Sequence, residues 1–193
     1  STGMPTRTQQ SDVLSCAYAS HGDTKHVLLI PSYPKECFEF AAEAFDLADR
    51  IQTPVIVLSD LDLGMNDWTC DQLEWDDSKL FDRGKVLKAK DLEEIENFGR
   101  YLDVDGDGIP YRTYPGTHSE KGAYFTRGSS HDEYAVYTED GNINARNLTR
   151  LLKKHENAAK LVPKPIIKSV NNSKGVIYFG GSDYSMIEAL DEL

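Results

Sequence analysis

Three aspartates alternate with other residues in the middle of the chain, and a glycine follows the third. The pattern matches the opening of a calcium-binding loop, in which carboxylates at alternate positions converge on one ion; the residues are Asp103, Asp105, Asp107 and Gly108. The twelfth position of such a loop needs a bidentate glutamate, and here it is Tyr114. Two interpretations stay open: a metal site at the three aspartates, or an acidic turn whose carboxylates bind its own backbone.

Residues 103–133 are rich in glycine and proline, which interrupt helices and strands. Long ordered loops in compact domains usually carry function. Because arginine binds carboxylates and phosphates through two parallel hydrogen bonds, the stretch predicts a loop that binds a small anion. The alternative is that its cations neutralise neighbouring carboxylates. The candidate donors are Arg112, His118, Lys121, Arg127 and His131, and His131 beside Asp132 could also serve in acid–base catalysis.

Several kinds of chemistry lack their sequence signal. No Gly-x-Ser-x-Gly, P-loop or His-Glu-x-x-His motif is present. Gly180-Gly181 before an expected helix could cradle a phosphate, but the dinucleotide fingerprint Gly-x-Gly-x-x-Gly is missing. The net charge of −11 argues against general nucleic-acid binding and against an anionic membrane surface.

The apolar runs and the cysteines indicate the cellular compartment of the protein. No apolar run approaches the roughly 20 residues of a membrane-spanning helix, and no signal peptide is recognisable. The cysteines are odd in number, widely spaced and unlike a disulfide framework or a zinc or iron–sulfur motif: Cys16, Cys37 and Cys70. We therefore predict a reduced, cytoplasmic protein.

The elements that must position these residues are those of an α/β fold. Residues 26–30 and 55–60 read as buried strands, and a helix starting at Pro34 lies between them, as in a parallel βαβ unit. Ligands in such sheets sit beyond the carboxyl ends of the strands, here 31–33 and 59–62. The buried helix face is predicted from three- and four-residue spacings to be Phe38, Ala41, Ala42, Phe45, Ala48 and Ile51.

The rest of the chain alternates irregular stretches with short elements. Residues 62–90 read as an acidic surface excursion anchored by Trp68 and Trp75, and a partner interface is the alternative. The other expected helices are 13–20, 91–102 with Asp91 as its cap, 142–160, and one after Gly181; the other expected strands are 134–137 and 175–179. We divide the chain into 1–75, 76–162 and 163–193, the last beginning a second α/β domain. The opening at Ser1 and the close within a new helix predict a fragment of a longer subunit.

Five segments together resemble one family. STGMPTRTQQSD (1–12) resembles the Ser-Thr-Gly-Leu-Pro-Thr-Arg-Thr-Gln-Gln segment of the α subunit of 2-oxoacid:ferredoxin oxidoreductases, particularly the 2-oxoglutarate type. The resemblance continues, in the family's order, through PKECFEFAAEAFDLADRIQTPVIVLSD, DGIPYRTYPGT, GAYFTRGSSHDEY and GVIYFGGS. It implies the latter part of a thiamine-diphosphate-binding pyrimidine domain, followed by the start of a transketolase C-terminal-like domain.

The resemblance also implies a reaction. A thiamine-diphosphate enzyme of this family oxidatively decarboxylates a 2-oxoacid, here 2-oxoglutarate to succinyl-CoA, and passes the electrons through a [4Fe-4S] cluster to ferredoxin. Magnesium, the diphosphate and the cluster would belong to a β subunit in an αβ hetero-oligomer. The alternatives are a pyruvate or branched-chain 2-oxoacid relative, and a non-catalytic calcium-binding α/β module.

The residues that match the family's motifs receive expected roles. Arg7 would pair with the substrate carboxylate, and Thr6, Thr8 and Gln10 would support it by hydrogen bonding. His131 and Asp132 match a Gly-x-x-His-Asp-Glu segment that approaches the substrate pocket, and we add the nearby Arg127 to the predicted substrate site. The Tyr-Pro-Ile-Thr-Pro motif and the glutamate that activates the aminopyrimidine are absent from this sequence, so the chain alone is expected to be inactive.

Overall fold

Two short parallel strands form the centre of the fold. The computed structural model describes residues 10–20, 25–128, 130–168 and 173–192. Strand β1 (Val27–Leu29) pairs with β2 (Val55–Val57), with Val27 opposite Val55 and Leu29 opposite Val57. Helix α2 (Pro34–Ile51) connects them. The predicted βαβ unit is therefore confirmed.

Helix α2 begins at the predicted proline and ends three residues before Pro54. Pro34 occupies the first turn, where its missing N–H costs no hydrogen bond. Gln52 ends the helix in the left-handed conformation, with φ of 51°. Directly after it, Thr53 and Pro54 lead the chain into β2.

The predicted face of α2 is only partly correct, because Ile51 is buried and Phe38, Ala42 and Ala48 are half-buried, whereas Ala41 is exposed. Leu47 and Ile51 are buried, and Phe40 and Ala44 pack beside them against the strands. Phe45 is 80% exposed. The helix carries apolar residues on more than one side, so two different sets satisfy three- and four-residue spacing, and contact with the sheet selects between them.

The excursion between β2 and the next helices covers part of the second apolar side of α2. Trp75 meets Phe38 edge-to-face, with ring centroids 6.1 Å apart, and stacks on Phe81 at the same separation. Apart from helix α3 (Leu61–Met65), which was not predicted, residues 58–85 contain no regular element.

Two predicted helix boundaries differ from those observed. Helix α1 spans Gln10–Ala17, earlier than expected. Helix α4 spans only Ala89–Glu94. Asp91 is not its N-cap but its third residue, and the carboxylate accepts the N–H of the true cap, Lys88, at 2.7 Å. The chain leaves the helix at Ile95, which has extended backbone angles (φ −92°, ψ 123°), so the predicted helical residues 95–102 are not helical.

The two additional predicted strands are also wrong. Residues 134–137 contribute only an isolated bridge between His131 and Tyr137, and residues 175–179 are irregular. Neither segment finds a neighbouring strand within the described ranges, and a strand needs such a partner for its backbone groups. Helix α5 (Gly141–Ala158) follows its cap Asp140 close to expectation, and the short 3₁₀ turn η1 (Gly180–Ser182) leads into α6 (Asp183–Asp191).

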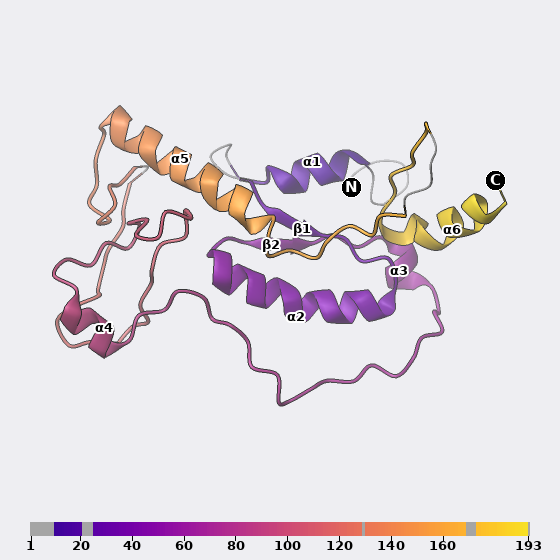
Figure 1. The fold of residues 1–193 in the computed structure, drawn as a ribbon, viewed down its shortest axis with the longest axis horizontal. Coiled ribbons are helices and arrows are strands. Elements are labelled where there is room, and N and C mark those ends of the chain that lie inside the picture. The colour runs from indigo at the N-terminus through magenta and orange to yellow at the C-terminus, as the bar shows by residue number, and fades with distance from the viewer. Residues whose placement is uncertain (1–9, 21–24, 129, 169–172, 193) are drawn as a thin grey trace.

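The strands separate α1 from α2, and α5 extends from them toward the loop region that contains α4 (Figure 1). Helices α3 and α6 lie together at the opposite end. One hydrophobic core connects the strands and α2 with the loop and α5. Its buried residues are Val27, Leu29, Leu47, Ile51, Ile109 and Ala158. Within the described ranges, every helix is too short or too polar to cross a bilayer. The proposed domain limits at 75 and 162 stay predictions.

Candidate functional site

The carboxyl edge of the strands is occupied by Asp60. Its Oδ1 accepts the N–H of Leu63 at 2.9 Å and so caps α3, and its Oδ2 accepts the N–H of Gly181 at 3.1 Å. A side chain at Gly181 would collide with this carboxylate. The Gly180-Gly181 turn therefore binds an anion of the chain itself, at the place where we considered a phosphate.

Aromatic rings and a thiol lie at the same edge. Tyr184 lies 6.2 Å from Tyr33 and 5.8 Å from Trp68 between ring centroids. Burial, with the charges of Glu36 and other acidic groups, raises the pKa of Tyr33. Burial likewise raises the pKa of Cys37, so its thiol is neutral and a poor nucleophile.

The predicted substrate arm falls largely outside the described residues. Thr6, Arg7 and Thr8 belong to residues 1–9, which lie outside them, and Gln10 is the first residue of α1. Their substrate-binding roles stay predictions.

His131 and Asp132 have well-defined neighbours. The His131 ring stacks on Tyr101, with centroids 4.0 Å apart. Its Nδ1 lies 2.8 Å from the Asp132 carbonyl oxygen, which can only accept, so Nδ1 is the donor in this contact. The Asp132 carboxylate accepts the N–H groups of Tyr134 and Val136, each at 2.9 Å, and holds the turn. Arg127 is exposed, and no described residue hydrogen-bonds or ion-pairs with it.

The remaining predicted anion donors have structural partners. Arg112 pairs with Asp49 at 3.0 Å, and His118 Nε2 lies 2.8 Å from the Glu93 carboxylate. Lys121 donates to the carbonyl oxygens of Leu92 and Ile95 at the end of α4, at 3.1 Å each. For these three residues the neutralising and capping interpretation fits the contacts better than anion binding.

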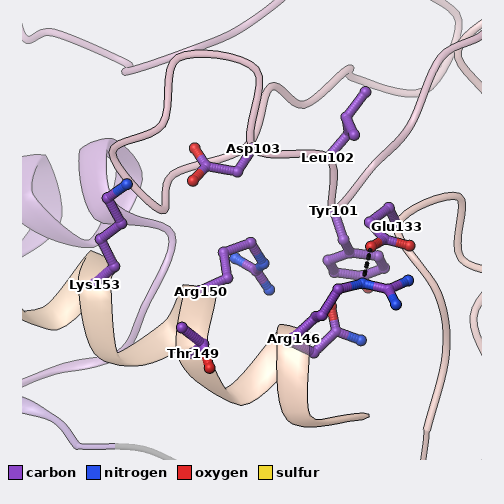
Figure 2. A pocket seen from close by; sticks show the side chains of 9 residues that line it. Tyr101, Leu102, Asp103, Glu133, Arg146, Thr149, Arg150 and Lys153 are labelled. Atoms are coloured by element: carbon purple, nitrogen blue, oxygen red, sulfur yellow. Dashed lines mark hydrogen bonds and ion pairs between the residues drawn. The ribbon is translucent and has the colours of Figure 1, made fainter. Parts of the chain in front are cut away.

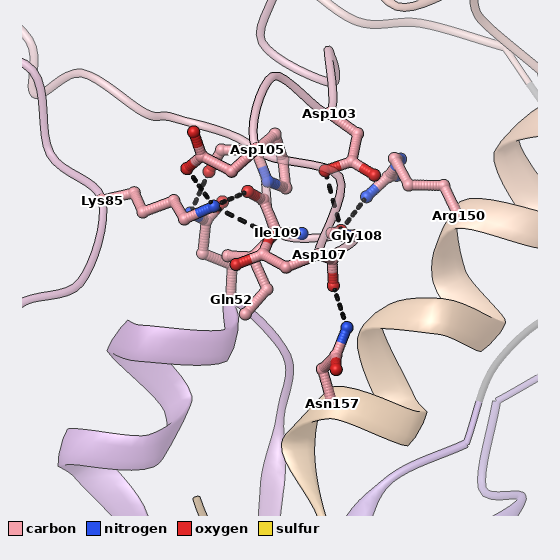
Figure 3. A network of polar contacts seen from close by, with 10 residues as sticks. Gln52, Lys85, Asp103, Asp105, Asp107, Gly108, Ile109, Arg150 and Asn157 are labelled. Atoms are coloured by element: carbon pink, nitrogen blue, oxygen red, sulfur yellow. Dashed lines mark hydrogen bonds and ion pairs between the residues drawn. The ribbon is translucent and has the colours of Figure 1, made fainter. Parts of the chain in front are cut away.

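Figure 3 shows Lys85 beside two of the three alternating aspartates, Asp105 and Asp107, with Asp103 on the side of Arg150. Lys85 Nζ lies 2.6 Å from Asp105 and 2.8 Å from Asp107, while Asp103 accepts the N–H of Gly108 at 3.0 Å. Burial alone would lower the pKa of Lys85, and the hydrogen bonds to Asp105 and Asp107 raise it above its ordinary value. In the described part of the chain no three His, Cys, Asp or Glu side chains could hold a metal ion. A metal at Asp103, Asp105 and Asp107 stays a prediction, and the structure gives their carboxylates other partners.

A pocket of about 340 Å³ opens between α5 and the segment that begins the loop (Figure 2). One wall is the polar face of α5, and the other is formed by the Tyr101 ring and the backbone that follows it. The lining residues are Tyr101, Leu102, Asp103, Glu133, Arg146, Asn147, Thr149, Arg150 and Lys153. His131 adjoins the pocket, because its carbonyl accepts the Asn147 side-chain N–H and its ring stacks on Tyr101.

Two cations of α5 differ in their burial near this pocket: Arg150 lines the pocket and is half-buried, whereas Lys154, in the next turn of the helix, is buried and does not line it. Lys154 is 7% exposed and donates to the Gln52 carbonyl at 3.1 Å and to the Thr53 hydroxyl. Burial, and then the charges of Arg150 and Arg100, lower the pKa of Lys154 to about 8. Burial also lowers the pKa of Arg150, an effect that the Asp103 carboxylate opposes.

The sequence-based search missed the cationic side of this pocket. Arg146, Arg150 and Lys153 recur at spacings of four and three residues, which places them on one face of α5. That spacing was the available signal.

A scan against family models matches residues 1–155 to "Pyruvate flavodoxin/ferredoxin oxidoreductase, thiamine diP-bdg". Among curated relatives, a 2-oxoacid:ferredoxin oxidoreductase subunit alpha of Aeropyrum pernix is 31% identical over all of this chain and 29% of its own length. The 2-oxoglutarate synthase subunit KorA of Methanothermobacter marburgensis is 48% identical over 60 residues, which cover 31% of this chain and 16% of the relative.

A solved structure shares the fold. The 2-oxoglutarate:ferredoxin oxidoreductase from Magnetococcus marinus, with 2-oxoglutarate, coenzyme A and succinyl-CoA bound, matches with a TM-score of 0.73 and 22% identity. The match covers all of this chain and 32% of that one, and the chain likewise spans about 30% of the full-length curated relatives. The family model covers most of the chain, and the chain therefore belongs to the thiamine-diphosphate-binding domain family of the pyruvate flavodoxin/ferredoxin oxidoreductases.

Proposed function

We propose that this chain is part of the α subunit of a thiamine-diphosphate-dependent 2-oxoacid:ferredoxin oxidoreductase that converts 2-oxoglutarate to succinyl-CoA. The overall reaction joins the acyl group to CoA, releases CO₂ and transfers two electrons to ferredoxin. The observation that carries the reaction class is similarity along the entire chain to α subunits with that name. The segment shared with 2-oxoglutarate synthase subunits, at 48% and 45% identity, favours 2-oxoglutarate as the substrate.

The cofactors are proposed to lie largely in a partner subunit. The described part of the chain offers no cluster of carboxylates, cysteines or histidines for magnesium or for an iron–sulfur cluster. Cys16 and Cys37 are half-buried and Cys70 is exposed, all three as free thiols. These residues do not fit a cluster site, so we assign the diphosphate, magnesium and the [4Fe-4S] cluster to a β subunit. The complete enzyme is then a cytoplasmic αβ hetero-oligomer that meets ferredoxin and CoA.

The substrate contacts proposed for this chain come from two segments. Arg7 pairs with the 2-oxoacid carboxylate, with Thr6, Thr8 and Gln10 in support. The second segment adds three residues to the proposed substrate site: Arg127, His131 and Asp132. The exposed Arg127 guanidinium, unpaired within the described ranges, suits such a role. The Asp132 carboxylate is engaged by its own turn, so we propose that it positions His131.

The test is CoA-dependent viologen reduction by the native complex that contains this chain, purified without oxygen. 2-Oxoglutarate should support reduction, with pyruvate and a branched-chain 2-oxoacid as comparisons. Reduction with 2-oxoglutarate alone would establish both reaction and substrate. Silence with every 2-oxoacid, in a preparation with an intact cluster, would reject the reaction class.

A pyruvate-specific enzyme is the second candidate, because the description of the matching family model names pyruvate. Reduction with pyruvate and not with 2-oxoglutarate would keep the reaction class and replace the substrate.

The non-catalytic calcium module has less support. Lys85 already neutralises two of its three aspartates. A chelator should leave the melting temperature of this region unchanged, and a lowered melting temperature would revive that alternative.

A further inference from the structure

We propose that the pocket between α5 and residues 101–103 binds a small oxyanion, a phosphate or carboxylate compound, through Arg150 and Lys153. This site is assigned from its own charges and shape and does not depend on the proposed oxidoreductase activity.

The pocket is locally positive in a chain of net charge −11. Arg146 is neutralised by Glu133, with Nε 3.1 Å from the carboxylate. Arg150 and Lys153 have no carboxylate oxygen within 4 Å among the described residues, and Lys153 is exposed at the rim. Figure 2 shows the Arg150 side chain between Lys153 and Arg146 on the helix side. Two cations are therefore available to a ligand.

Arg150 is held in place before any ligand arrives. Its Nη1 donates to the Gly108 carbonyl at 3.0 Å, and its guanidinium carbon lies 5.9 Å from the centre of the Tyr101 ring. The buried Nε of Arg150 has no hydrogen-bond partner in the described part of the chain. The Nε of Arg100 likewise has none there, and the Arg100 guanidinium lies 5.1 Å from the centre of the same Tyr101 ring. A planar guanidinium fixed in this way loses little conformational entropy when it binds an oxyanion.

The pocket volume limits the ligand. About 340 Å³ is near the lower end of ligand pockets and equals the liquid volume of roughly ten water molecules. Inorganic phosphate, a small phosphate monoester or a short dicarboxylate fits within this space. Asp103 also lines it, so its negative charge opposes a fully ionised ligand.

Hydrogen–deuterium exchange of the native subunit complex, at constant ionic strength, tests the proposal. The probes are inorganic phosphate, glycerol 3-phosphate and succinate, each raised to tens of millimolar. Binding should slow exchange in peptides that cover residues 101–108 and 146–154. Protection by the two phosphate compounds alone would identify a phosphate site, and protection by succinate alone a carboxylate site. Both results support an oxyanion site, whereas no protection by any probe would overturn it.

Charge variants make the test specific. Lys153→Gln should weaken binding of the anion that protects the pocket several-fold, and Lys153→Glu should weaken it about tenfold or more, as expected for loss of a charge-assisted hydrogen bond. Asp103→Asn should have the opposite effect and strengthen binding, because it removes the repulsion and keeps an oxygen that can accept the Gly108 N–H. Lys90→Gln, an exposed lysine on α4, is the matched control. Protection that persists unchanged in Lys153→Glu would contradict the proposal.

The 2-oxoacid assay and the hydrogen–deuterium exchange test are separate measurements on the same complex. Failure of that assay in the wild-type complex would reject the proposed function and leave the anion result standing. Failure of phosphate and succinate to protect the pocket would reject the anion site and leave the proposed function standing.

Discussion

Lys154 is a buried positive charge at the contact between α5 and the turn that follows α2. It has no carboxylate partner among the described residues and is held by a carbonyl and a hydroxyl beside the charges of Arg150 and Arg100. Such an arrangement joins α5 to the turn between α2 and β2, at the cost of burying a charge. An uncompensated charge in this position makes stability depend on pH.

We predict that the stability of this region rises between about pH 8 and pH 10.5. The folded state has a Lys154 pKa of about 8, below the ordinary 10.5. Within this window the folded chain loses the proton that the unfolded chain keeps, so deprotonation favours folding, by up to about 3 kcal/mol. Denaturant unfolding of wild type and Lys154→Met from pH 7 to 10 measures the difference. Parallel curves for the two proteins would contradict the assignment.

Arg7 supplies the second prediction at this scale. If its guanidinium pairs with the substrate carboxylate, Arg7→Ala should raise KM and lower kcat/KM by several-fold or more, because a charge-assisted pair in a site shielded from water is strong. Arg7→Lys keeps the charge and should recover part of the loss. Steady-state viologen reduction gives these constants, and unchanged constants in a folded Arg7→Ala complex would remove the role.

At the scale of elements, the loop around Asp107 is packed directly against α5. Gly108 has φ of +85°, and a Cβ built there would lie 2.5 Å from the backbone nitrogen of Lys154. The Asp107 carbonyl accepts the Asn157 amide, and the Gly108 carbonyl accepts Arg150. Glycine is thus required by both its conformation and the close approach of a helix.

Gly108→Ala should therefore destabilise the protein by several kcal/mol, since the helix backbone must move. The matched control is Gly106→Ala in the same loop, which has φ of +70° but only the flexible end of Lys153 nearby, at 3.7 Å. That variant carries the backbone strain alone and should lose about 1 kcal/mol. Equal losses for the two variants in chemical denaturation would show that packing against α5 is unimportant.

The end of α4 depends on a lysine from the loop. Lys121 binds the last carbonyl oxygens of the helix, which have no partner within it. Lys121→Met should speed hydrogen exchange of residues 92–95 and cost about 1 kcal/mol. Lys90→Met on the same helix should change neither. Unaltered exchange in Lys121→Met would make the contact incidental.

Local patterns predicted the elements that contain a strong start or stop signal. Pro34 predicted the start of one long helix, and the apolar runs before Pro31 and after Pro54 predicted the parallel pair. The buried side of α2 was not predictable, because Phe45 and Phe40 are equally apolar and only the tertiary contact distinguishes them. The ion pair between Lys85 and Asp105 was not predictable either, because no local spacing rule relates two residues that far apart in the sequence.

The molecule as a whole exposes far more surface than a compact protein of its mass. Its accessible area is 13885 Å², whereas the size relation for a folded 21.6 kDa protein gives about 9,200 Å². Large apolar side chains contribute to the excess, among them Leu80 at 93%, Ile166 at 89% and Ile177 at 95% exposure. Surfaces of this kind are usually covered by other parts of a protein or by partners.

We therefore expect the 193-residue chain, when expressed alone, to bind a hydrophobic dye such as anilinonaphthalene sulfonate strongly. The native complex should bind much less dye per subunit, because its apolar surface is covered. Fluorescence titration of both preparations makes the comparison. An isolated chain that binds little dye and unfolds cooperatively would show that it buries its own core.

The distant hydrogen bonds of Thr53 and Asp60 also bear on how the protein is made. Their partners, Lys154 and Gly181, lie 101 and 121 residues later in the sequence. At roughly 5–20 residues per second, a ribosome needs on the order of 5 to 25 seconds to synthesise the missing partner. During that interval the nascent β1–β2 pair has an incomplete edge, and it is the stage of synthesis at which a chaperone would be of most use.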